Sequence, residues 1–491
     1  MSLDKLQAVV LAAGKATRFK TGQTKLIEKI CGQEMILFSA KLLEKLNAPT
    51  TFVVGYQREI IEDVISKNTS AKPTFVHQKE QLGTGHAVAC TKDLWNKEHI
   101  LILNGDVPLV TKKIIEKLYK KHKESDAAIS FVVSHYTGPD HAYGRIVEDE
   151  NSIKIIEAKD FNQDVYDEKC CINAGIYLVK TDFLKKCIDK ITTKNAAKEF
   201  YLTDLVQMAC KKNLKVVTSY APFDRIRGIN DFEELWATEQ IKRSEIIKHW
   251  MKNGVRFRLA QKIHVDVGVQ IEPGSTIGSG VHLLGNTKIG KNCNIRKFST
   301  IENATVEDNV EILPNTIIRD SHVSKNAKIG PFAHIHTQSK IEQDVVIGNF
   351  VEIKKSTIGA NTKAKHLAYL GNATIGSRVN IGAGTITCNH DGFKKNETVI
   401  QNNVYIGSNN TLVAPITIGQ NSFTAAGSTI TENTPKNCLA IGRSRQVNKE
   451  NYVQKLLEKL KARSIGTNGQ KDDKTQAPCT IKGKKALEKE L

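Results

Sequence analysis

An aliphatic residue recurs every six positions through most of residues 271–430, and this period restricts the fold more than any other feature of the sequence. The spacing is interrupted by five-residue steps, from Ile301 to Val306, from Ile318 to Val323 and from Ile353 to Ile358, and resumes after each. A long series of six-residue repeats predicts a parallel β-helix, in which each coil stacks its aliphatic residues on those of the next coil. Glycine often follows the aliphatic residue, as in Ile277-Gly278, which suits a tight corner between flat faces. The series includes Ile271, Ile277, Leu283, Ile289, Ile295 and, after the middle coils, Ile400, Ile406, Leu412, Ile418 and Ile430, with Thr424 in one position.

Two stretches interrupt the six-residue period and are candidate binding regions. The first is AKHLAYLGNATIG, residues 364–376, and the second is the polar insertion TCNHDGFKKNET, residues 387–398. The insertion is predicted to be a loop that projects from the β-helix. Because binding residues concentrate on loops held by a rigid scaffold, we expect functional side chains in these two stretches.

The first 232 residues follow a different pattern. Short apolar runs such as 8–11, 100–103 and 176–179 alternate with helical segments such as 203–212. This alternation predicts a Rossmann-like α/β domain with a mixed, mainly parallel sheet covered by helices. The expected organisation is an α/β domain over 1–232, a linker helix over 233–253, a β-helix domain over 254–451, and a lysine-rich tail over 452–491 that begins as a helix and is then mostly disordered.

Composition excludes several classes of protein. No apolar run reaches the roughly 20 residues of a transmembrane helix, and the first residues lack the features of a signal peptide. Ten cysteines without a C-x-x-C pair predict free thiols in a reducing, cytoplasmic compartment. The net charge of +19 would suit nucleic acid or small anions. Because the excess is mainly lysine spread along the chain, we expect small anionic substrates and consider nucleic acid and membrane insertion unlikely.

The segment LAAGKATRFKTGQTKL, residues 11–26, follows an apolar run and combines a glycine with several cations. It is either a phosphate-binding turn or a basic surface loop. Two further motifs favour the first interpretation. QKEQLGTGHA, residues 78–87, has glycines that permit close approach of backbone to a ligand. LNGDVPL, residues 103–109, places Asp106 at the carboxyl end of a strand, where open α/β sheets bind ligands.

These motifs, followed in order by AYGRIVED, INAGIY, EFYLTD and RGIND, resemble the sugar-nucleotide pyrophosphorylases, whose signature is L-x-x-G-x-G-T-R-x-x-x-x-x-x-K. The later segments KHLAYLGNATIG and NIGAGTITCN are similar to those of bacterial enzymes that join such a domain to a left-handed hexapeptide-repeat β-helix. The resemblance covers roughly residues 6–450. It implies acetyl transfer from acetyl-CoA to glucosamine-1-phosphate, then uridylyl transfer from UTP to N-acetylglucosamine-1-phosphate with release of pyrophosphate.

The resemblance also implies roles for residues of the N-terminal domain. Arg18 and Lys25 would neutralise the phosphates during transfer, and Asp106 and Asn230 would hold Mg²⁺ through hard oxygen ligands. The uracil would be read by Gln78, Gly83 and Thr84. The sugar would be held by Gly144, Glu157 and Asn173. The remaining nucleotide-binding residues are Leu11, Ala12, Ala13, Gly14, Asn104 and Gly105. Without the resemblance, Asp106 could be a turn former, Glu157 a solvated charge and Asn173 a partner for buried backbone.

For the β-helix the resemblance implies that His366 is the general base for the attacking amine and that Glu352 orients its imidazole. A lone histidine could equally be structural. The sugar-phosphate contacts would be His336, Lys354, Tyr369, Asn380 and Lys395, and the acetyl-CoA contacts would be Ala383, Asn389, His390, Ser408, Ala426 and Arg443. In the family these sites form between the β-helices of a homotrimer.

Four residues depart from the family pattern. Ala16 replaces a glycine of the opening motif, Thr24 replaces a proline, and His390 replaces a tyrosine. His336 replaces an arginine and cannot make the bidentate phosphate contact that arginine makes. Two alternatives therefore stay open: a uridyltransferase whose β-helix only assembles the oligomer, and a non-catalytic regulatory subunit. Retention of Arg18, Lys25, Asp106 and Asn230 argues against the second alternative.

Overall fold

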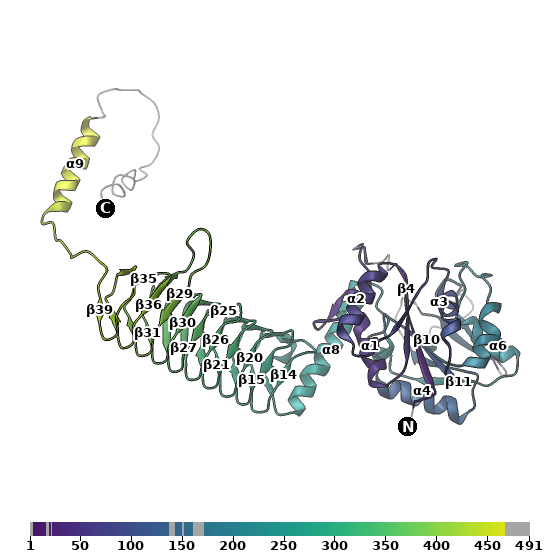
Figure 1. The fold of residues 1–491 in the computed structure, drawn as a ribbon. Helices are drawn as coiled ribbons and strands as arrows, with labels where there is room; N and C mark the ends of the chain where they lie inside the picture. Colours follow the sequence, from purple (N-terminus) through teal and green to yellow (C-terminus); the bar gives the residue numbers. More distant parts are fainter. Residues whose placement is uncertain are drawn as a thin grey trace. The chain divides into compact units, whose positions relative to one another are not determined.

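A computed structural model describes residues 3–15, 19–20, 22–136, 143–149, 152–160 and 171–466 (Figure 1). The chain divides into two units after Ile441. The first unit contains an α/β domain, a long helix and a left-handed parallel β-helix, as the sequence predicts. The second unit contains α9 (Tyr452–Gly466). Ala16, Arg18 and residues 467–491 of the predicted tail lie outside the described residues. In the part of the chain described, no helix combines the length and apolarity needed to cross a membrane.

The α/β domain is built on a mixed sheet in which parallel strands β4, β1 and β6 lie side by side, and β10 runs antiparallel to β6 and β7. The path of the sheet is β11 (Val216–Tyr220), β7 (Ile129–His135), β10 (Cys171–Lys180), β6 (His99–Asn104), β1 (Leu6–Ala12), β4 (Thr50–Val54) and β5 (Thr74–His77). Off this path, β8 (Arg145–Asp149) pairs with β10, and β9 (Ser152–Ile156) pairs with β8. A small hairpin joins β2 (Lys29–Ile30) and β3 (Gln33–Glu34).

Helices cover both faces of this sheet because its strands are apolar on both sides. Along β1, Ala8 and Val10 enter one core cluster, while Val9 between them enters the other. This follows from the two-residue period of a strand. The first cluster packs under α1 (Met35–Lys45), α2 (Arg58–Asn68) and α4 (Lys112–Glu124), and the second under α3 (Thr84–Ala89), α5 (Thr181–Cys187) and α6 (Asp204–Lys211). A short helix, α7 (Phe223–Ile226), precedes the long connecting helix.

A buried histidine in this core makes the stability of the domain depend on pH. His122 of α4 hydrogen-bonds Ser130 Oγ at 2.8 Å, and burial, with a smaller effect of nearby His99, lowers its pKa from 6.5 to about 3. Between pH 6.5 and pH 3 the unfolded chain therefore binds a proton that the folded domain excludes. The stabilising effect of the neutral imidazole is complete above pH 6.5 and is lost as the pH falls through this window.

We expect His122 to account for a loss of about 2 kcal/mol of unfolding free energy between pH 7.5 and pH 5. His122→Gln cannot titrate, so its unfolding free energy should fall by about 2 kcal/mol less over the same interval. Urea unfolding of both proteins at the two pH values measures the difference. Equal pH slopes for the two proteins would contradict the assignment.

The connecting helix α8 (Phe232–Lys252) begins at Asp231, whose carboxylate accepts a hydrogen bond from Glu234 N at 2.8 Å. This N-cap satisfies one of the backbone N–H groups that a helix start leaves unpaired. At the other end of the helix, Ile247 is buried in the core of the β-helix. The helix thus leads directly into the first coil, which starts with β12 (Arg256–Phe257).

The β-helix has three parallel ladders, and the six-residue period of the sequence is their origin. Ile277, Ile295, Ile312, Ile329 and Ile347 are in register on successive coils and are fully buried. The other aliphatic residues of the series stack in the same way. We call the ladder that contains these five isoleucines face A. Its strands are β12, β15 (Thr276–Ile277), β18 (Asn294–Ile295), β21 (Glu311–Ile312), β24 (Lys328–Ile329), the start of β27 (Val346–Lys354), the start of β29 (Lys363–Gly371), β31 (Asn380–Ile381), β34 (Tyr405–Ile406), β37 (Phe423–Thr424) and β39 (Leu439–Ala440).

The second face, face B, is formed by the ladder that contains the ends of β27 and β29. Its strands are β13 (His264–Val265), β16 (His282–Leu284), β19 (Thr300–Glu302), β22 (Ile317–Arg319), β25 (His334–His336), the ends of β27 and β29, β32 (Ile386–Cys388), β35 (Thr411–Val413) and β38 (Thr429–Ile430). The third face is a separate sheet of β14 (Gln270–Ile271), β17 (Lys288–Ile289), β20 (Thr305–Val306), β23 (His322–Val323), β26 (Lys340–Ile341), β28 (Thr357–Ile358), β30 (Ala373–Ile375), β33 (Thr398–Ile400) and β36 (Ile416–Ile418).

One of the two predicted interruptions is not an interruption. Residues 364–376 continue the coil in register, because Ala364 pairs with Ile347 and Ile381 and takes the inward position. Ala364 is buried, but its side chain is too small to be recognised in the sequence as a member of the aliphatic series. The second interruption is real: β32 ends at Cys388 and β33 begins at Thr398. The residues between them form the loop that the sequence predicts.

Candidate active sites

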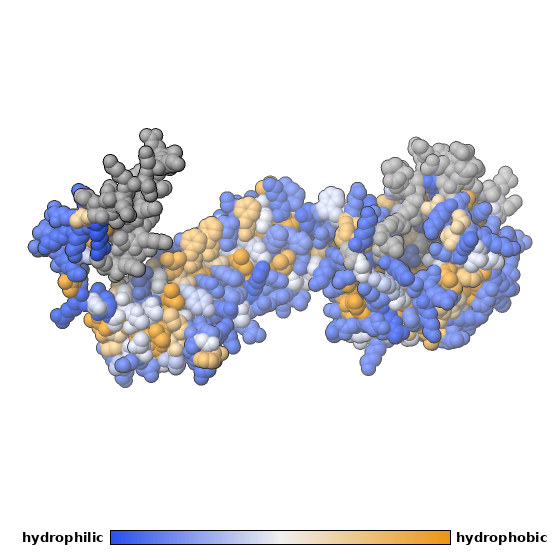
Figure 2. All heavy atoms as spheres, turned by 90° about the horizontal axis from the view of Figure 1, so that it is seen from above, coloured by the Kyte–Doolittle hydropathy of each residue, from blue (hydrophilic) through white to orange (hydrophobic). Residues whose placement is uncertain are grey.

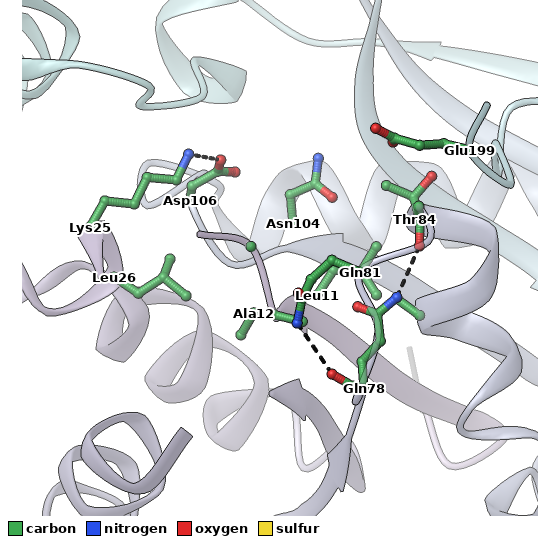
Figure 3. Close-up of a pocket in the computed structure, with 14 residues that line it drawn as sticks. Leu11, Ala12, Lys25, Leu26, Gln78, Gln81, Thr84, Asn104, Asp106 and Glu199 are labelled. Carbon is green, nitrogen blue, oxygen red and sulfur yellow. Dashed lines mark hydrogen bonds and ion pairs between the residues drawn. The ribbon is translucent and has the colours of Figure 1, made fainter. Parts of the chain in front are cut away.

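A cleft opens at the carboxyl ends of β1 and β6 in the α/β domain (Figure 3). It consists of two adjoining cavities of about 370 Å³ and about 170 Å³ that share Leu11, Thr84, Asn104 and Asp106. The larger cavity is lined by the predicted nucleotide residues Leu11, Ala12, Ala13, Gly14, Lys25, Gln78, Gly83, Thr84, Asn104 and Asp106. The smaller is lined by the predicted sugar and metal residues Asp106, Gly144, Glu157, Asn173 and Asn230.

The turn after β1 forms the floor of the larger cavity. Leu11 pairs with Asn104 in the parallel register of β1 and β6, so both strands end at the same level. Gly105 lines neither cavity; its N–H donates to Leu11 O at 2.9 Å, and a Cβ there would lie 3.0 Å from the same oxygen. Its role in the structure is to let the two strand ends approach. At Gly14 the space around a Cβ is open.

Lys25 and Asp106 meet at the boundary of the two cavities. Lys25 Nζ lies 2.6 Å from Asp106 Oδ2 and donates to Ile229 O at 2.7 Å. The preceding Thr24 has φ −66°, the value that proline would impose. Its N–H, which proline would lack, donates to Gln57 Oε1 at 2.7 Å. The Thr24 departure is therefore accommodated, because the backbone keeps the conformation typical of proline and gains a hydrogen bond.

The loop before α3 closes the far wall of the larger cavity (Figure 3). Gln78 is buried and its Nε2 donates to Gly83 O at 3.2 Å. Gly83 has φ +110°, and a Cβ there would lie 2.7 Å from Phe200 O. Thr84 Oγ1 accepts from Leu202 N at 3.1 Å, so the loop is fastened to residues 199–202. Both the backbone angle and the space require glycine at position 83.

Gly83→Ala should lower the melting temperature of the α/β domain and raise the KM for UTP about tenfold or more. The reason is backbone strain on the order of 1–3 kcal/mol together with the clash at Phe200. Thermal melts and UTP titrations of pyrophosphate release measure both effects. Gly228→Ala is the matched control for stability, because the nearest atom to its Cβ would be Tyr143 Oη at 3.8 Å. Equal melting temperatures for the two variants would contradict the strain argument.

The smaller cavity is polar and partly desolvated. Glu157 Oε1 accepts a hydrogen bond from Thr203 Oγ1 at 3.0 Å, and burial raises the pKa of Glu157. Asn173 is buried and its Nδ2 donates to Tyr177 Oη at 2.5 Å. Gly144 O accepts from Asn173 N at 2.8 Å, which joins the two predicted sugar residues through the backbone. The cavity therefore offers oriented acceptors and donors suited to sugar hydroxyl groups.

Several lining residues were not predicted from the sequence. Tyr143 Oη accepts from Gly228 N at 3.0 Å and closes one side of the smaller cavity. Thr203 holds Glu157, and Glu199 lines the larger cavity. Thr203 and Glu199 lie within the EFYLTD motif, which is the sequence signal from which their place in the cleft could have been predicted. Tyr143 belongs to AYGRIVED, but nothing in that motif indicates that its hydroxyl faces the cleft.

The β-helix carries the second set of predicted residues. His366 is exposed at the corner between faces A and B, and its Nδ1 lies 3.2 Å from Asn349 Oδ1. Ala364, Ile381, Ile406 and Thr424 are in register. His366 lies two residues after the first of these four. The predicted acetyl-CoA residues Ala383, Ser408 and Ala426 lie two residues after the other three, so they follow His366 along the same corner on successive coils.

The other predicted residues lie on both sides of this corner. Asn380 is on face A, whereas Glu352, Lys354 and Tyr369 are on face B. Within one chain the register separates Glu352 from His366, so the expected contact between them stays a prediction for the assembled trimer. The register puts Asn349 beside His366 and Glu352 beside Tyr369, and Glu352 Oε1 lies 3.2 Å from His336 Nε2. Adjacent faces of one coil cannot bring all of these side chains into one cavity.

The loop between β32 and β33 is stabilised by its own polar groups. Asp391 accepts hydrogen bonds from Phe393 N, Lys394 N and Asn396 Nδ2, which lower the pKa of Asp391. Buried Asn389 donates to Asn372 Oδ1 at 2.8 Å and anchors the start of the loop. Lys395 lines a cavity of about 430 Å³ at the base of the loop. His390 is exposed, and its backbone forms an isolated antiparallel β-bridge with Lys395. Arg443 belongs to the second unit of the chain.

Comparisons with known proteins match segments of the α/β domain and of the β-helix. A family model described as a MobA-like NTP transferase domain matches residues 8–150, and one described as bacterial transferase hexapeptide (six repeats) matches 268–303, 320–355 and 397–432. The bifunctional protein GlmU of Streptococcus thermophilus (strain CNRZ 1066) is 41% identical over 453 residues, which cover 91% of this chain and 97% of that protein. The bifunctional protein GlmU of Geotalea uraniireducens is 39% identical over 458 residues, with coverages of 92% and 99%. A crystal structure of UDP-glucose pyrophosphorylase complexed with UDP-glucose aligns at a TM-score of 0.41 and 15% identity, over 49% of this chain and 98% of that one.

Proposed function

Because the chain belongs to the family of bifunctional GlmU proteins, we infer that it makes UDP-N-acetylglucosamine with two separate active sites. The chain is a bifunctional transferase. The β-helix transfers an acetyl group from acetyl-CoA to glucosamine-1-phosphate, and the α/β domain transfers a uridylyl group from UTP to the product. The observation that carries the assignment of the second reaction is the divided cleft, whose two cavities fit a nucleotide and a sugar phosphate and meet at Lys25 and Asp106.

In the α/β domain, the chemistry needed is mainly positioning and neutralisation of charge. The uracil would bind at Gln78, Gly83 and Thr84, and the sugar at Gly144, Glu157 and Asn173. Lys25 is held between two oxygen acceptors where the cavities meet. Its ammonium group would stabilise charge on the phosphates as a phosphate oxygen of the sugar attacks the α-phosphorus. We assign Arg18, which lies outside the described residues, the same task from the preceding turn.

The polar groups at the junction suit a magnesium ion. Asp106 and Asn230 line the same small cavity and supply a carboxylate and an amide oxygen, the hard ligands that Mg²⁺ prefers. The ammonium of Lys25 pairs with the Asp106 carboxylate there, which supports the proposal that positive charge gathers at this carboxylate. A bound Mg²⁺ would neutralise phosphate oxygens. Asn230 is positioned for this by its N–H, which donates to Glu234 Oε2 at 2.5 Å.

In the β-helix, His366 would take the proton from the glucosamine amine as that amine attacks the thioester of acetyl-CoA. The corner row of Ala383, Ser408 and Ala426 supports acetyl-CoA binding beside it, with Asn389, His390 and Arg443 as further contacts. His336, Lys354, Tyr369, Asn380 and Lys395 would bind the sugar phosphate. Within one chain, Asn349 contacts His366 and would orient its imidazole, while the role expected of Glu352 stays a prediction.

These residues lie on two faces, so we propose that the acetyltransferase site is completed by neighbouring chains in a homotrimer. An exposed apolar row supports this proposal: Phe332, Phe350 and Leu367 are 49%, 58% and 62% exposed on successive coils next to His366. Figure 2 shows hydrophobic surface over the β-helix coils. Sedimentation equilibrium of the full chain should give the mass of three chains. Both substrate pairs are metabolites of the cytoplasm, which is the compartment that we propose.

Two assays on one purified sample test the bifunctional assignment. The first follows pyrophosphate release from UTP and N-acetylglucosamine-1-phosphate with Mg²⁺, and the second follows CoA release from acetyl-CoA and glucosamine-1-phosphate. Activity in both is the expected result. Pyrophosphate release alone would leave the β-helix as a scaffold, and silence in both assays would favour a non-catalytic regulatory protein.

A further inference from the structure

We propose that His334, His336 and Glu352 form a binding site for a divalent transition-metal ion such as Zn²⁺ on face B of the β-helix, with an open coordination position that takes a phosphate oxygen. One potential ligand atom from each of the three side chains lies within 4.8 Å of the other two. The part of the proposal that names the phosphate of the amino sugar rests on the proposed acetyltransferase function. The metal site itself does not.

The backbone brings the three side chains together. His334 and His336 are two residues apart on β25, so both point outward on either side of buried Ile335. Glu352 lies on the next coil, in register with His334. The two imidazole rings are stacked with centroids 4.2 Å apart and an interplanar angle of 14°. Strand and coil geometry thus fix the cluster, and large backbone movement is not needed to bind an ion.

The distances are close to those of a coordination sphere. Zn²⁺ binds histidine nitrogen and carboxylate oxygen at about 2.0–2.2 Å, which separates the ligand atoms of a tetrahedral ion by about 3.4 Å. His336 Nε2 and Glu352 Oε1 are already 3.2 Å apart. The ligand atom of His334 lies within 4.8 Å of the other two, so side-chain rotation would bring it into the same coordination sphere. Two imidazoles and one carboxylate are also a ligand set that zinc sites use when a fourth position stays open.

A contact with the hydroxyl of Thr337 orients the His336 ring for this role. Its Nδ1 lies 2.8 Å from Thr337 Oγ1, while Nε2 faces Glu352. Histidines that bind metals usually fix the other ring nitrogen with such a partner. Exposure is also suitable, because the Glu352 side chain is 45% exposed and that of His336 is 16% exposed. An ion could therefore enter from solvent and keep one position toward the substrate side.

The surroundings favour an anion in the open position. Lys354 lies on the neighbouring coil in register with His336, and the positive charges of Arg319 and Lys354 are close enough to act on His334. These cations weaken the attraction for a free metal ion but strengthen the binding of an anion that ligates it. A phosphate monoester satisfies both the ion and the lysine. A bound ion would then supply positive charge to the phosphate at the position of His336.

Metal binding by the full-length chain, without substrate, is the first test. Zn²⁺ affinity is measured by competition with a chromophoric chelator, and Co²⁺ is added separately to record its ligand-field absorption. We expect one Zn²⁺ per chain, and at least 100-fold weaker binding in His336→Ala and Glu352→Gln. His322→Ala is the matched control, because His322 also pairs with a glutamate across coils, at 2.9 Å, but stands outside the cluster. Equal affinity in the wild-type chain and the cluster variants would overturn the proposal.

The open position is tested with inorganic phosphate, and then with glucosamine-1-phosphate, as probes of the Co²⁺ spectrum. A spectral shift that saturates with either probe supports a coordinated phosphate oxygen, and an unchanged spectrum overturns that half of the proposal. In the CoA-release assay, removal of zinc should raise the KM for glucosamine-1-phosphate at least tenfold. His336→Arg, which replaces a ligand by a fixed cation, should make that KM insensitive to chelator. Zinc binding in a chain that releases no CoA under any condition would refute the proposed acetyltransferase but leave the metal site standing.

Discussion

Replacing Asp106 by asparagine is expected to reduce pyrophosphate release about 10³-fold, because several kcal/mol of charge stabilisation are lost with the carboxylate. The substitution keeps the shape of the side chain at the junction of the two cavities. It removes the negative charge that pairs with Lys25 at 2.6 Å and that would hold Mg²⁺. Lys25 retains its hydrogen bond to Ile229 O, so the local fold should survive.

Initial rates of pyrophosphate release at saturating UTP, with Mg²⁺ varied, measure this effect. CoA release by the same preparation is the internal control and should be unchanged, since the second site lies on the β-helix. Asp63→Asn is a matched substitution of an exposed carboxylate that pairs with Lys67 on α2. If Asp106→Asn kept more than a tenth of the wild-type rate, the assigned role of Asp106 would be wrong.

The second large effect is expected for His366→Asn in the acetyl-transfer reaction. Removal of a general base costs typically 10²–10⁴-fold in rate, and we expect kcat for CoA release to fall by about 10³-fold. His366 is exposed and its contact is with Asn349 Oδ1, so the variant should fold and assemble normally. Pyrophosphate release should not change.

The matched control is His322→Asn, the same substitution at another outward-facing histidine of the β-helix. Asn349→Ala adds information about positioning: it should lower kcat less than His366→Asn and leave the KM for acetyl-CoA unchanged. A His366→Asn enzyme with wild-type kcat would show that another group accepts the proton.

Much of the fold could be predicted because its signals are local. The six-residue period can be recognised in short segments, because each coil repeats the pattern of the coil before it. The aliphatic residues of that series are buried in the core of the β-helix. The motifs of the α/β domain could likewise be assigned to one cleft, because strand ends of an open sheet share an edge. The predicted break at 364–376 failed, since Ala364 fills an inward position without the bulk by which the pattern is recognised.

The candidate sites were harder to predict, because their contacts depend on which faces adjacent coils present. Glu352 was expected beside His366, yet a register of seventeen residues per coil places Asn349 there instead. On the preceding coil, a register of eighteen residues pairs Glu352 with His334, and the three-residue cluster forms because Glu352 Oε1 also lies 3.2 Å from His336 Nε2. Coils of seventeen and of eighteen residues both stay in register along face A, so the sequence period alone does not show which outward side chains become neighbours.

By itself, the sequence determined the β-helix, the alternation of strands and helices before it, and the residue types of the two sites, since these follow from short periods and from side-chain chemistry. Only the tertiary structure decided which of those residues meet. Lys25, Asp106 and Ile229 come from three distant segments, and Gly83 is required by Phe200, more than a hundred residues away. Such contacts arise from crossover connections and strand register, which depend on the whole chain and leave no local signal in any one segment.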